Sequence, residues 1–357
     1  FPYADYQTKV AASIPAGEGP DVVQLFYGWL DGYIDAKLLQ PLPADAFAPA
    51  KVEAEFFPMV KAMRRGEAYY ALPTAVRSLA MFWNKRLFAE AGLDPTKPPA
   101  TLDELVAMAG KLTKKDGAGN ITQVGITMDM TAQDHHWWRE VLVRQFGGEP
   151  YLDNYRTVNY ATEAGAKALD FYVGLQRDHG VARMGFMDEA QAGFKAGRAG
   201  MHIDGSFRIG ALERTRGLEW GVGELPAGPT GVRSNFASYW VNGITTKATG
   251  EKQAAAARFM AHLTSPEAMQ LWLEVVGELP ARPAVALTPA NTANPVYGPF
   301  IKGLDYAHAT VFADETQQRQ IAIDMTNRVL LENAPVPDAL KEAAAKEQAL
   351  LDRVFGK

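Results

Sequence analysis

The chain has 357 residues, of which 47% are hydrophobic and 22% charged, so it can bury large cores and should divide into about two domains. Its formal net charge of −5, with basic residues that form no stripe, argues against nucleic acid or an anionic membrane as a partner. The lack of cysteine excludes disulfides, thiolate metal sites and a cysteine nucleophile.

A helix and a strand are the first predicted elements. Residues 6–14 have the pattern of an amphipathic helix, residues 17–20 form a Gly-rich turn, and residues 22–25 indicate a buried strand. A helix that leads into a parallel strand normally follows another strand, for which only Phe1 and Pro2 remain. We therefore expect the first strand and helix of the fold to be missing from this chain. We also expect no signal peptide in it and no membrane span, because neither an apolar leader nor a run of about 18 apolar residues is present.

Strand-like and helical segments alternate along the rest of the chain. The pattern favours strands at residues 68–73, 78–83, 124–129, 200–204 and 240–246, with helical stretches between them. This alternation predicts an α/β protein with two lobes.

The last third of the chain has the clearest helical patterns. A predicted strand at residues 236–247 is followed by two helices that break at Ser265-Pro266 and stop at Gly277. The last helix, residues 337–355, has one apolar and one charged face, so it should pack against a lobe.

Catalytic motifs are missing from the sequence. The histidines are scattered, and no HExxH, GxSxG or Gly-rich phosphate loop is found. His135 and His136 are adjacent, but adjacent residues on a helix point in different directions, so we expect them not to share a metal ion. The turn at residues 116–120 lacks the alternating carboxylates of a calcium loop. We expect no enzyme activity, no metal site and no cofactor.

Motifs along the whole chain resemble those of one family. They are Tyr6 with Lys9, residues 19–25, Trp29 with Tyr33, residues 38–42, the strand and Asn-Lys within residues 66–95, the helix at 97–112, and the stretches 192–207, 239–247, 263–272 and 277–283. Their order and spacing are similar to those of the extracellular solute-binding proteins of bacterial ABC sugar importers, the maltose-binding-protein-like group. The resemblance implies a two-lobe periplasmic-binding-protein architecture with hinge strands and a cleft between the lobes.

The resemblance also implies how the chain divides. Residues 1–76 and 244–296 would form lobe 1, with its first strand and helix missing, and residues 77–243 and 297–357 would form lobe 2. The hinges would lie at residues 74–77, 240–244 and 309–313.

A sugar site needs flat aromatic rings for the apolar face of the sugar and fixed polar groups for its hydroxyl rim. Five aromatic residues fall where strands end or helices begin, namely Trp29, Trp137, Phe207, Tyr239 and Trp240. Each of them has core packing as an alternative.

Polar candidates come from the resemblance, which implies that Asp31, Arg77, Asp204, Ser206 and Arg282 line the cleft. Tyr27, His136 and Gly205 complete the expected set of ligand-binding residues. Alternatives remain for some of them: Arg77 can form a salt bridge between lobes, residues 204–207 can form a simple turn, and Arg282 can be a solvated loop charge.

The function implied by the resemblance is that of a monomeric, non-enzymatic protein in the periplasm, or outside the cell with a membrane tether. It would capture a sugar or polyol and deliver it to the transmembrane permease subunits of an ABC importer. Two alternatives stay open. Arg77, Arg208 and Arg282 suit an anionic sugar derivative, a phosphate or sulfonate. A glycoside hydrolase needs two carboxylates about 5–10 Å apart, and no such pair stands out in the sequence.

Overall fold

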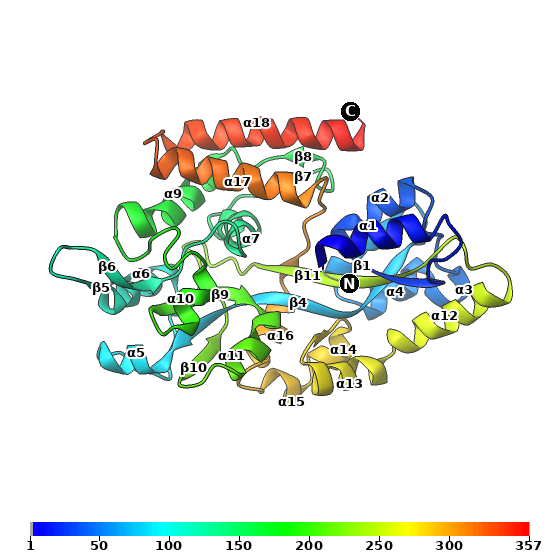
Figure 1. The fold of residues 1–357 in the computed structure, drawn as a ribbon, viewed down its shortest axis with the longest axis horizontal. Coiled ribbons are helices and arrows are strands. Elements are labelled where there is room, and N and C mark those ends of the chain that lie inside the picture. Colours follow the sequence, from blue (N-terminus) through cyan, green and yellow to red (C-terminus); the bar gives the residue numbers. More distant parts are fainter. Residues whose placement is uncertain (1–2, 357) are drawn as a thin grey trace. The chain divides into compact units, whose positions relative to one another are not determined.

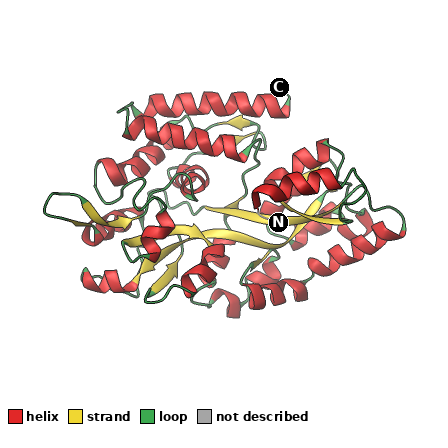
Figure 2. Ribbon diagram, in the orientation of Figure 1, coloured by secondary structure: helices red, strands yellow, loops and turns green. Residues whose placement is uncertain are grey.

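The structure, a computed structural model, describes residues 3–356, and the chain forms two compact units. Unit 1 comprises residues 1–77 and 237–292, and unit 2 comprises residues 78–236 and 293–357. Both units combine helices with strands (Figure 2). The predicted lobe limits at 76/77, 243/244 and 296/297 differ from these by one to seven residues. The second limit falls inside a continuous strand, where the sequence pattern does not change, and the division into those lobes stays a prediction.

Unit 1 contains mostly short elements (Figure 1). Its helices are α1 (Tyr3–Ser13), α2 (Leu30–Asp35), α3 (Ala44–Phe47), α4 (Pro49–Glu55), α12 (Glu251–Leu263), α13 (Pro266–Val276), α14 (Pro283–Ala286) and α15 (Pro289–Thr292), with 3₁₀ turns η1 (Tyr27–Trp29) and η2 (Pro58–Met63). Its strands are β1 (Val22–Phe26), β2 (Arg64–Arg65), β3 (Ala68–Tyr69), β12 (Leu279–Pro280) and parts of β4 (Ala71–Asn84) and β11 (Asn235–Ile244).

The sheet of unit 1 has the strand order β1-β11-β4-β12. Strand β1 runs antiparallel to β11, in a register from Val22↔Ile244 to Phe26↔Trp240. The parallel partner expected for this strand was a strand before the first helix, and the antiparallel pairing of β1 with β11 does not test that expectation. Phe1 and Pro2, the remnant assigned to a preceding strand, lie outside the described residues.

The two helices predicted on either side of Ser265-Pro266 are confirmed as α12 and α13. The Ser265 side chain accepts a hydrogen bond from the Ala268 backbone N–H at 3.2 Å, and Pro266 takes the first position of α13. Gly277 ends the helix with a φ of 78°, a left-handed conformation that glycine adopts without strain. Helix α13 therefore begins and ends where its sequence signals lie.

Unit 2 is the larger of the two units. Its helices are α5 (Lys85–Glu90), α6 (Leu102–Leu112), α7 (Asp134–His136), α8 (Val143–Gln145), α9 (Glu163–Arg177), α10 (Ala190–Lys195), α11 (Ile209–Glu213), α16 (Gly298–Leu304), α17 (Glu315–Leu330) and α18 (Val336–Phe355), with the π-helix η3 (Trp137–Leu142) and the 3₁₀ turn η4 (Ser206–Arg208). Its strands are β5 (Lys114–Lys115), β6 (Ile121–Ile126), β7 (Tyr151–Leu152), β8 (Thr157–Val158), β9 (Ala199–Gly205), β10 (Trp220–Gly223) and β13 (Ala307–His308), with the remaining parts of β4 and β11.

The main sheet of unit 2 has the order β10-β4-β9-β6-β5. Strand β6 is parallel to β9, and the other pairs are antiparallel. Gly125 on β6 allows a close approach to helix α6, since a Cβ there would lie 2.1 Å from the backbone oxygen of Ala109. The apolar core packs around this sheet with α6, α9, α17 and α18, and α17 and α18 lie side by side (Figure 1).

Helix α18 confirms the predicted amphipathic helix, with one unexpected residue on its apolar face. Glu347 is fully buried there. Its carboxylate accepts hydrogen bonds from the hydroxyls of Tyr151 (2.5 Å) and Tyr160 (2.7 Å) and from Nε2 of Gln318 (2.7 Å). Nη2 of Arg139, also buried, lies 3.5 Å from Oε2. A charged network thus ties α17 and α18 to the π-helix.

None of the helices formed by residues 3–356 is both long enough and apolar enough to span a bilayer.

Candidate functional site

Three aromatic rings meet at the end of β1 in unit 1. Because Phe26 and Trp240 are directly opposed in the β1–β11 register, their side chains point to the same face of the sheet. Their ring centroids lie 6.1 Å apart, and Trp29 in η1 lies 5.9 Å from Phe26 and 5.6 Å from Trp240, all in edge-to-face geometry. All three rings are partly exposed. We call Phe26, Trp29 and Trp240 the aromatic cluster; the Tyr6 ring also meets Trp240, at 6.3 Å between centroids, and flat apolar rings are what a sugar site requires.

The neighbouring tyrosines belong to the interior of unit 1. Tyr27 and Tyr239 are both buried, their rings lie 4.6 Å apart, and the Tyr239 hydroxyl donates to the carbonyl oxygen of Met59 at 2.8 Å. Both tyrosines pack in the core in this structure, and their predicted ligand contacts stay predictions. Tyr239 and Trp240 are consecutive on β11, and successive side chains of a strand point to opposite faces, so the two rings do not share one surface.

Two acidic residues of unit 1 hold arginines. Asp31 receives two parallel hydrogen bonds from Arg65, at 2.5 and 2.7 Å. Arg77 donates to Glu278 through Nε at 2.9 Å and Nη2 at 2.5 Å. Both pairs are partly exposed and bidentate, a geometry that fixes the planes of the side chains. The salt bridge considered for Arg77 thus exists, but both of its residues lie in unit 1.

Arg282 connects elements within unit 1. Its guanidinium donates to Glu55 (2.5 Å) and to the carbonyl oxygen of Thr264 (2.7 Å), and it lies 4.3 Å from the ring centroid of Phe56. In this structure the donors of Arg282 serve α4 and the end of α12, so it is not a solvated loop charge, and its role in ligand binding stays a prediction.

A polar network ends β9 in unit 2. The Asp204 carboxylate accepts from Nε of Arg208 (2.6 Å) and from the Gly205 backbone N–H (2.7 Å), and it contacts Nε2 of His202 at 3.0 Å. Nδ1 of His202 lies 2.8 Å from Thr127 Oγ1. Burial acts to raise the pKa of Asp204, but His202 and Arg208 outweigh it and hold that pKa below its usual value. Asp204 is buried and serves this network, and its place on a ligand rim stays a prediction.

The residues after Asp204 differ in exposure. Gly205 and Ser206 are buried, whereas Phe207 is 37% exposed. The Phe207 ring folds back over Gly205, where a Cβ would lie 2.2 Å from it. Phe207 is thus the residue of this stretch that a ligand can reach, and its role stays a prediction.

Trp137 and His136 are buried in unit 2. Trp137 is 1% exposed and packs edge-to-face on Phe171 and Tyr172, which favours the core-packing alternative, and its ligand contact stays a prediction. The His136 ring stacks on Phe236 with centroids 3.7 Å apart and an interplanar angle of 8°. At 6% exposure it offers no face to a sugar ring.

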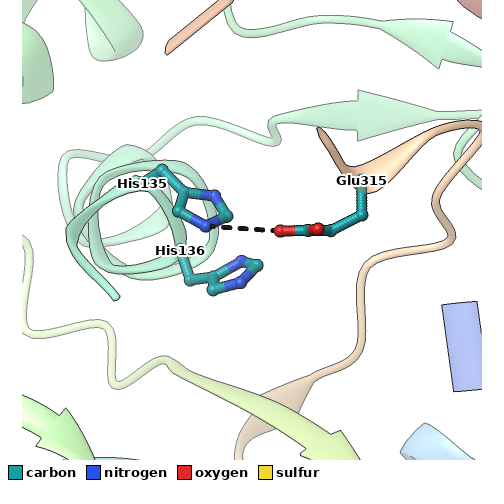
Figure 3. Close-up of side chains that lie close together, drawn as sticks. All are labelled: His135, His136 and Glu315. Carbon is teal, nitrogen blue, oxygen red and sulfur yellow. Dashed lines mark ion pairs between the residues drawn. The ribbon is translucent and has the colours of Figure 1, made fainter. Parts of the chain in front are cut away.

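The two adjacent histidines do approach each other. Their ring centroids lie 3.7 Å apart, although we expected them to point in different directions. Figure 3 shows both rings extending from their helix toward Glu315, the first residue of α17. Nε2 of His135 lies 3.9 Å from Oε1 of Glu315. The expectation failed because χ1 rotation at two consecutive positions can bring rings together even when their Cβ atoms diverge.

Sequence reasoning missed several of these residues. Phe26 was readable, since it directly follows the strand predicted at residues 22–25 and alternates with buried Leu25 at the end of β1. Arg65, Glu278 and Glu315 had no such signal, because each meets its partner from a distant part of the chain.

With this geometry in hand, comparison with known proteins identifies the family. Residues 1–298 match the family model described as bacterial extracellular solute-binding protein. The chain belongs to this family. The predicted membership is confirmed, and members of the family bind substrates rather than transform them.

Individual relatives extend the comparison. The maltotriose-binding protein of Pyrococcus abyssi is 25% identical over 312 residues, which cover 85% of this chain and 64% of that protein. The sn-glycerol-3-phosphate-binding periplasmic protein of Yersinia pestis is 23% identical over 297 residues, covering 77% and 65%. The chain spans 54 to 65% of the length of the curated solute-binding relatives considered.

A solved structure of similar fold is the cyclic alpha-maltosyl-1,6-maltose binding protein from Arthrobacter globiformis. It matches with a TM-score of 0.84 and 24% identity, over 99% of this chain and 90% of that one. This likeness confirms the predicted α/β, two-lobe periplasmic-binding-protein fold.

Proposed function

We propose that this solute-binding protein is the substrate-binding component of an ABC importer, which captures a sugar or polyol between its two lobes and delivers it to the transmembrane permease. The observation that carries the proposal is the aromatic cluster of Phe26, Trp29 and Trp240. Rings of this kind stack on the C–H face of a sugar. Binding of a metal ion or a peptide does not require such rings. The maltotriose-binding relative supports the same ligand class.

An anionic sugar derivative is the second candidate. The glycerol-3-phosphate-binding relative favours it. The three arginines suggested by the sequence speak against it, because Arg77, Arg208 and Arg282 each hold a carboxylate of their own unit. An anion would have to displace those carboxylates, so we rank the neutral sugar first.

Calorimetry tests the ligand class. The protein is titrated with maltose, maltotriose, a monosaccharide, a polyol and sn-glycerol 3-phosphate, and the mixtures are then analysed for reaction products. We expect binding of a neutral sugar without turnover. Binding of the phosphate alone would overturn the neutral-sugar proposal, and release of product would overturn the proposal of a binding protein.

The variant Trp240→Ala tests the aromatic cluster, with Trp272→Ala as its matched control. Trp272 is also a partly exposed tryptophan of unit 1, but it lies on α13 outside the cluster. Loss of one stacking ring should weaken sugar binding about tenfold, the equivalent of about 1.4 kcal/mol. Equal affinities of the two variants would contradict the assignment.

The proposal includes closure of the lobes around the ligand. A ligand shifts an open form to a closed form only by its different affinity for the two, and strands that pass between lobes supply the hinges. β4 and β11 are the strands that contribute to both units. Small-angle scattering should give a smaller radius of gyration with saturating sugar, and an unchanged radius with binding confirmed by calorimetry would rule closure out.

The remaining features of the proposal concern the cell. We place the protein in the periplasm, or outside the cell on a membrane tether, and we expect it to act as a monomer. The extracellular family supports the compartment. Gel filtration with light scattering tests the monomer.

A further inference from the structure

The cluster of His135, His136 and Glu315 in unit 2 is not used by the proposed sugar site. Each residue offers one ligand atom, and these atoms all lie within 4.8 Å of one another. The histidines end α7, and Glu315 begins α17 almost 180 residues later in the chain. The tertiary fold therefore brings the three donors together (Figure 3).

Both histidines are buried with an unused polar atom. His135 is 1% and His136 6% exposed. Among residues 3–356, no hydrogen-bond partner reaches Nδ1 of either ring. A buried polar group without a partner is costly in folded proteins, and a cation bound at Nδ1 of His136 would satisfy one of the two.

The surroundings select an ion over an organic ligand. Phe236 stacks on the His136 ring and Phe312 meets it edge-on, which leaves no ring face for a sugar. The Glu315 side chain is 23% exposed and provides access from solvent.

The local charges are compatible with a cation at Glu315. Nη1 of Arg319 lies 3.6 Å from Oε1 of Glu315, with 35% of its side chain exposed. Arg139 lies against buried Glu347. Arg319 is thus the cation that must turn to solvent when Glu315 binds an ion.

We propose that His135, His136 and Glu315 bind a divalent transition-metal ion, with Zn²⁺ as the ion that their donor set suits. One nitrogen from each ring and one carboxylate oxygen would coordinate it. Two imidazoles and a carboxylate are a ligand set that zinc accepts, and a water molecule completes the four-coordinate shell.

The geometry requires only small movements. Donor atoms at zinc distances of about 2.0–2.2 Å lie about 3.3 Å apart in a tetrahedral site. His135 Nε2 and Glu315 Oε1 are at 3.9 Å, so modest side-chain rotations suffice. The π-helix η3 begins at Trp137, directly after the pair, and π-helical insertions occur frequently at functional sites.

The alternative is that the histidines are ordinary stacked core residues beside Phe236. Both interpretations predict that replacing a histidine lowers stability. They differ in the effect of metal, and in the effect of Glu315→Gln, which keeps the size of the side chain and removes its charge.

The experiment uses untagged, chelator-treated protein titrated with Zn²⁺ in a calorimeter, and with Co²⁺ while the visible spectrum is recorded. The variants are Glu315→Gln and His136→Asn, and the control is His179→Gln, an exposed histidine of unit 2. Thermal melting with and without Zn²⁺ gives a second readout, because an ion that binds only the folded state raises the melting temperature.

We expect one equivalent of Zn²⁺ per wild-type chain, at least tenfold weaker binding in Glu315→Gln and His136→Asn, and no change in His179→Gln. The Co²⁺ absorption bands and the zinc-induced shift in melting temperature should be lost in Glu315→Gln. No stoichiometric binding by the wild type, binding unchanged in Glu315→Gln, or binding lost in His179→Gln would each overturn the proposal. If His136→Asn does not fold, Glu315→Gln decides. The result is independent of the sugar titrations, because the metal titration contains no sugar.

Discussion

The buried carboxylate of Glu347 permits a prediction whose size follows from its surroundings. We consider Glu347→Gln, which keeps the shape of the side chain and removes its charge. In the parent protein, burial acts to lower the pKa of Arg139, and nearby groups, first among them the Glu347 carboxylate, act to raise it. The raising effects together are the larger, so the pKa of Arg139 lies above its usual value. Burial also raises the pKa of Tyr151 and Tyr160, so both hydroxyls keep their protons and donate to Glu347.

The substitution leaves Arg139 as a fully buried charge without a counter-charge at 3.5 Å. Breaking one partner of such a pair costs about 3–5 kcal/mol. The amide of glutamine can accept hydrogen bonds only through its oxygen, so some of the three donors from Tyr151, Tyr160 and Gln318 lose their acceptor. We expect the free energy of unfolding of unit 2 to fall by about 3–5 kcal/mol.

Urea unfolding followed by tryptophan fluorescence and circular dichroism measures this change. The control is Glu342→Gln on the same helix, whose partners Arg328 and Lys346 form surface pairs worth about 0–1 kcal/mol. The double variant Arg139→Met, Glu347→Gln removes the unpaired charge and keeps one acceptor oxygen, so it should recover most of the loss. A loss below about 1 kcal/mol in Glu347→Gln, or no recovery in the double variant, would refute the reasoning.

Three further predictions follow from particular side chains. Trp137→Ala should lower the free energy of unfolding by about 3–5 kcal/mol in urea titrations, because Trp137 is buried. The sugar affinity of this variant, measured below the urea concentrations that unfold it, should equal that of the parent. Weaker sugar binding would place Trp137 in the ligand site. Burial raises the pKa of Asp134 from 3.8 to about 7, so the folded state holds this proton more tightly than the unfolded state. The resulting contribution to the free energy of unfolding is complete below about pH 4 and should be lost as the pH rises through about 7. Asp134→Asn should remove this pH dependence of the free energy of unfolding, and the same pH dependence in the variant would contradict the assignment. Gly125→Ala should destabilise unit 2 by at least about 1–3 kcal/mol, since the new Cβ would lie 2.1 Å from the Ala109 backbone oxygen; a melting temperature equal to that of the parent would show that α6 moves without cost.

Elements with local signals could be predicted from the sequence. The Ser265-Pro266 start and Gly277 stop of α13 are set by capping chemistry within a few residues. The same holds for α18, whose apolar period is readable over its whole length. The family motifs supplied the fold class, because their order along the chain is preserved even where each motif is loose.

Contacts between distant residues could not be predicted. Arg77 meets Glu278 across 201 positions, and no local pattern of either residue announces the other. From the sequence, Arg77 and Arg282 were therefore candidates for an anionic ligand, with a salt bridge as the alternative for Arg77, and in the structure each already holds a carboxylate. The direction of side chains on one strand was readable, and the pairing of Tyr239 with Trp240 on one surface overlooked the alternation of β11.

Strand β4 has a consequence for how the protein is made. Its 14 residues continue from unit 1 into unit 2, and β11 returns the chain to unit 1 only after residue 236. A ribosome that adds about 5–20 residues per second needs on the order of 10–30 s to make residues 78–236. During that time the nascent β1 lacks β11, its ladder partner, and its backbone edge is open to foreign strands. Chaperones that shield the emerging chain should therefore matter most before residue 244 is synthesised.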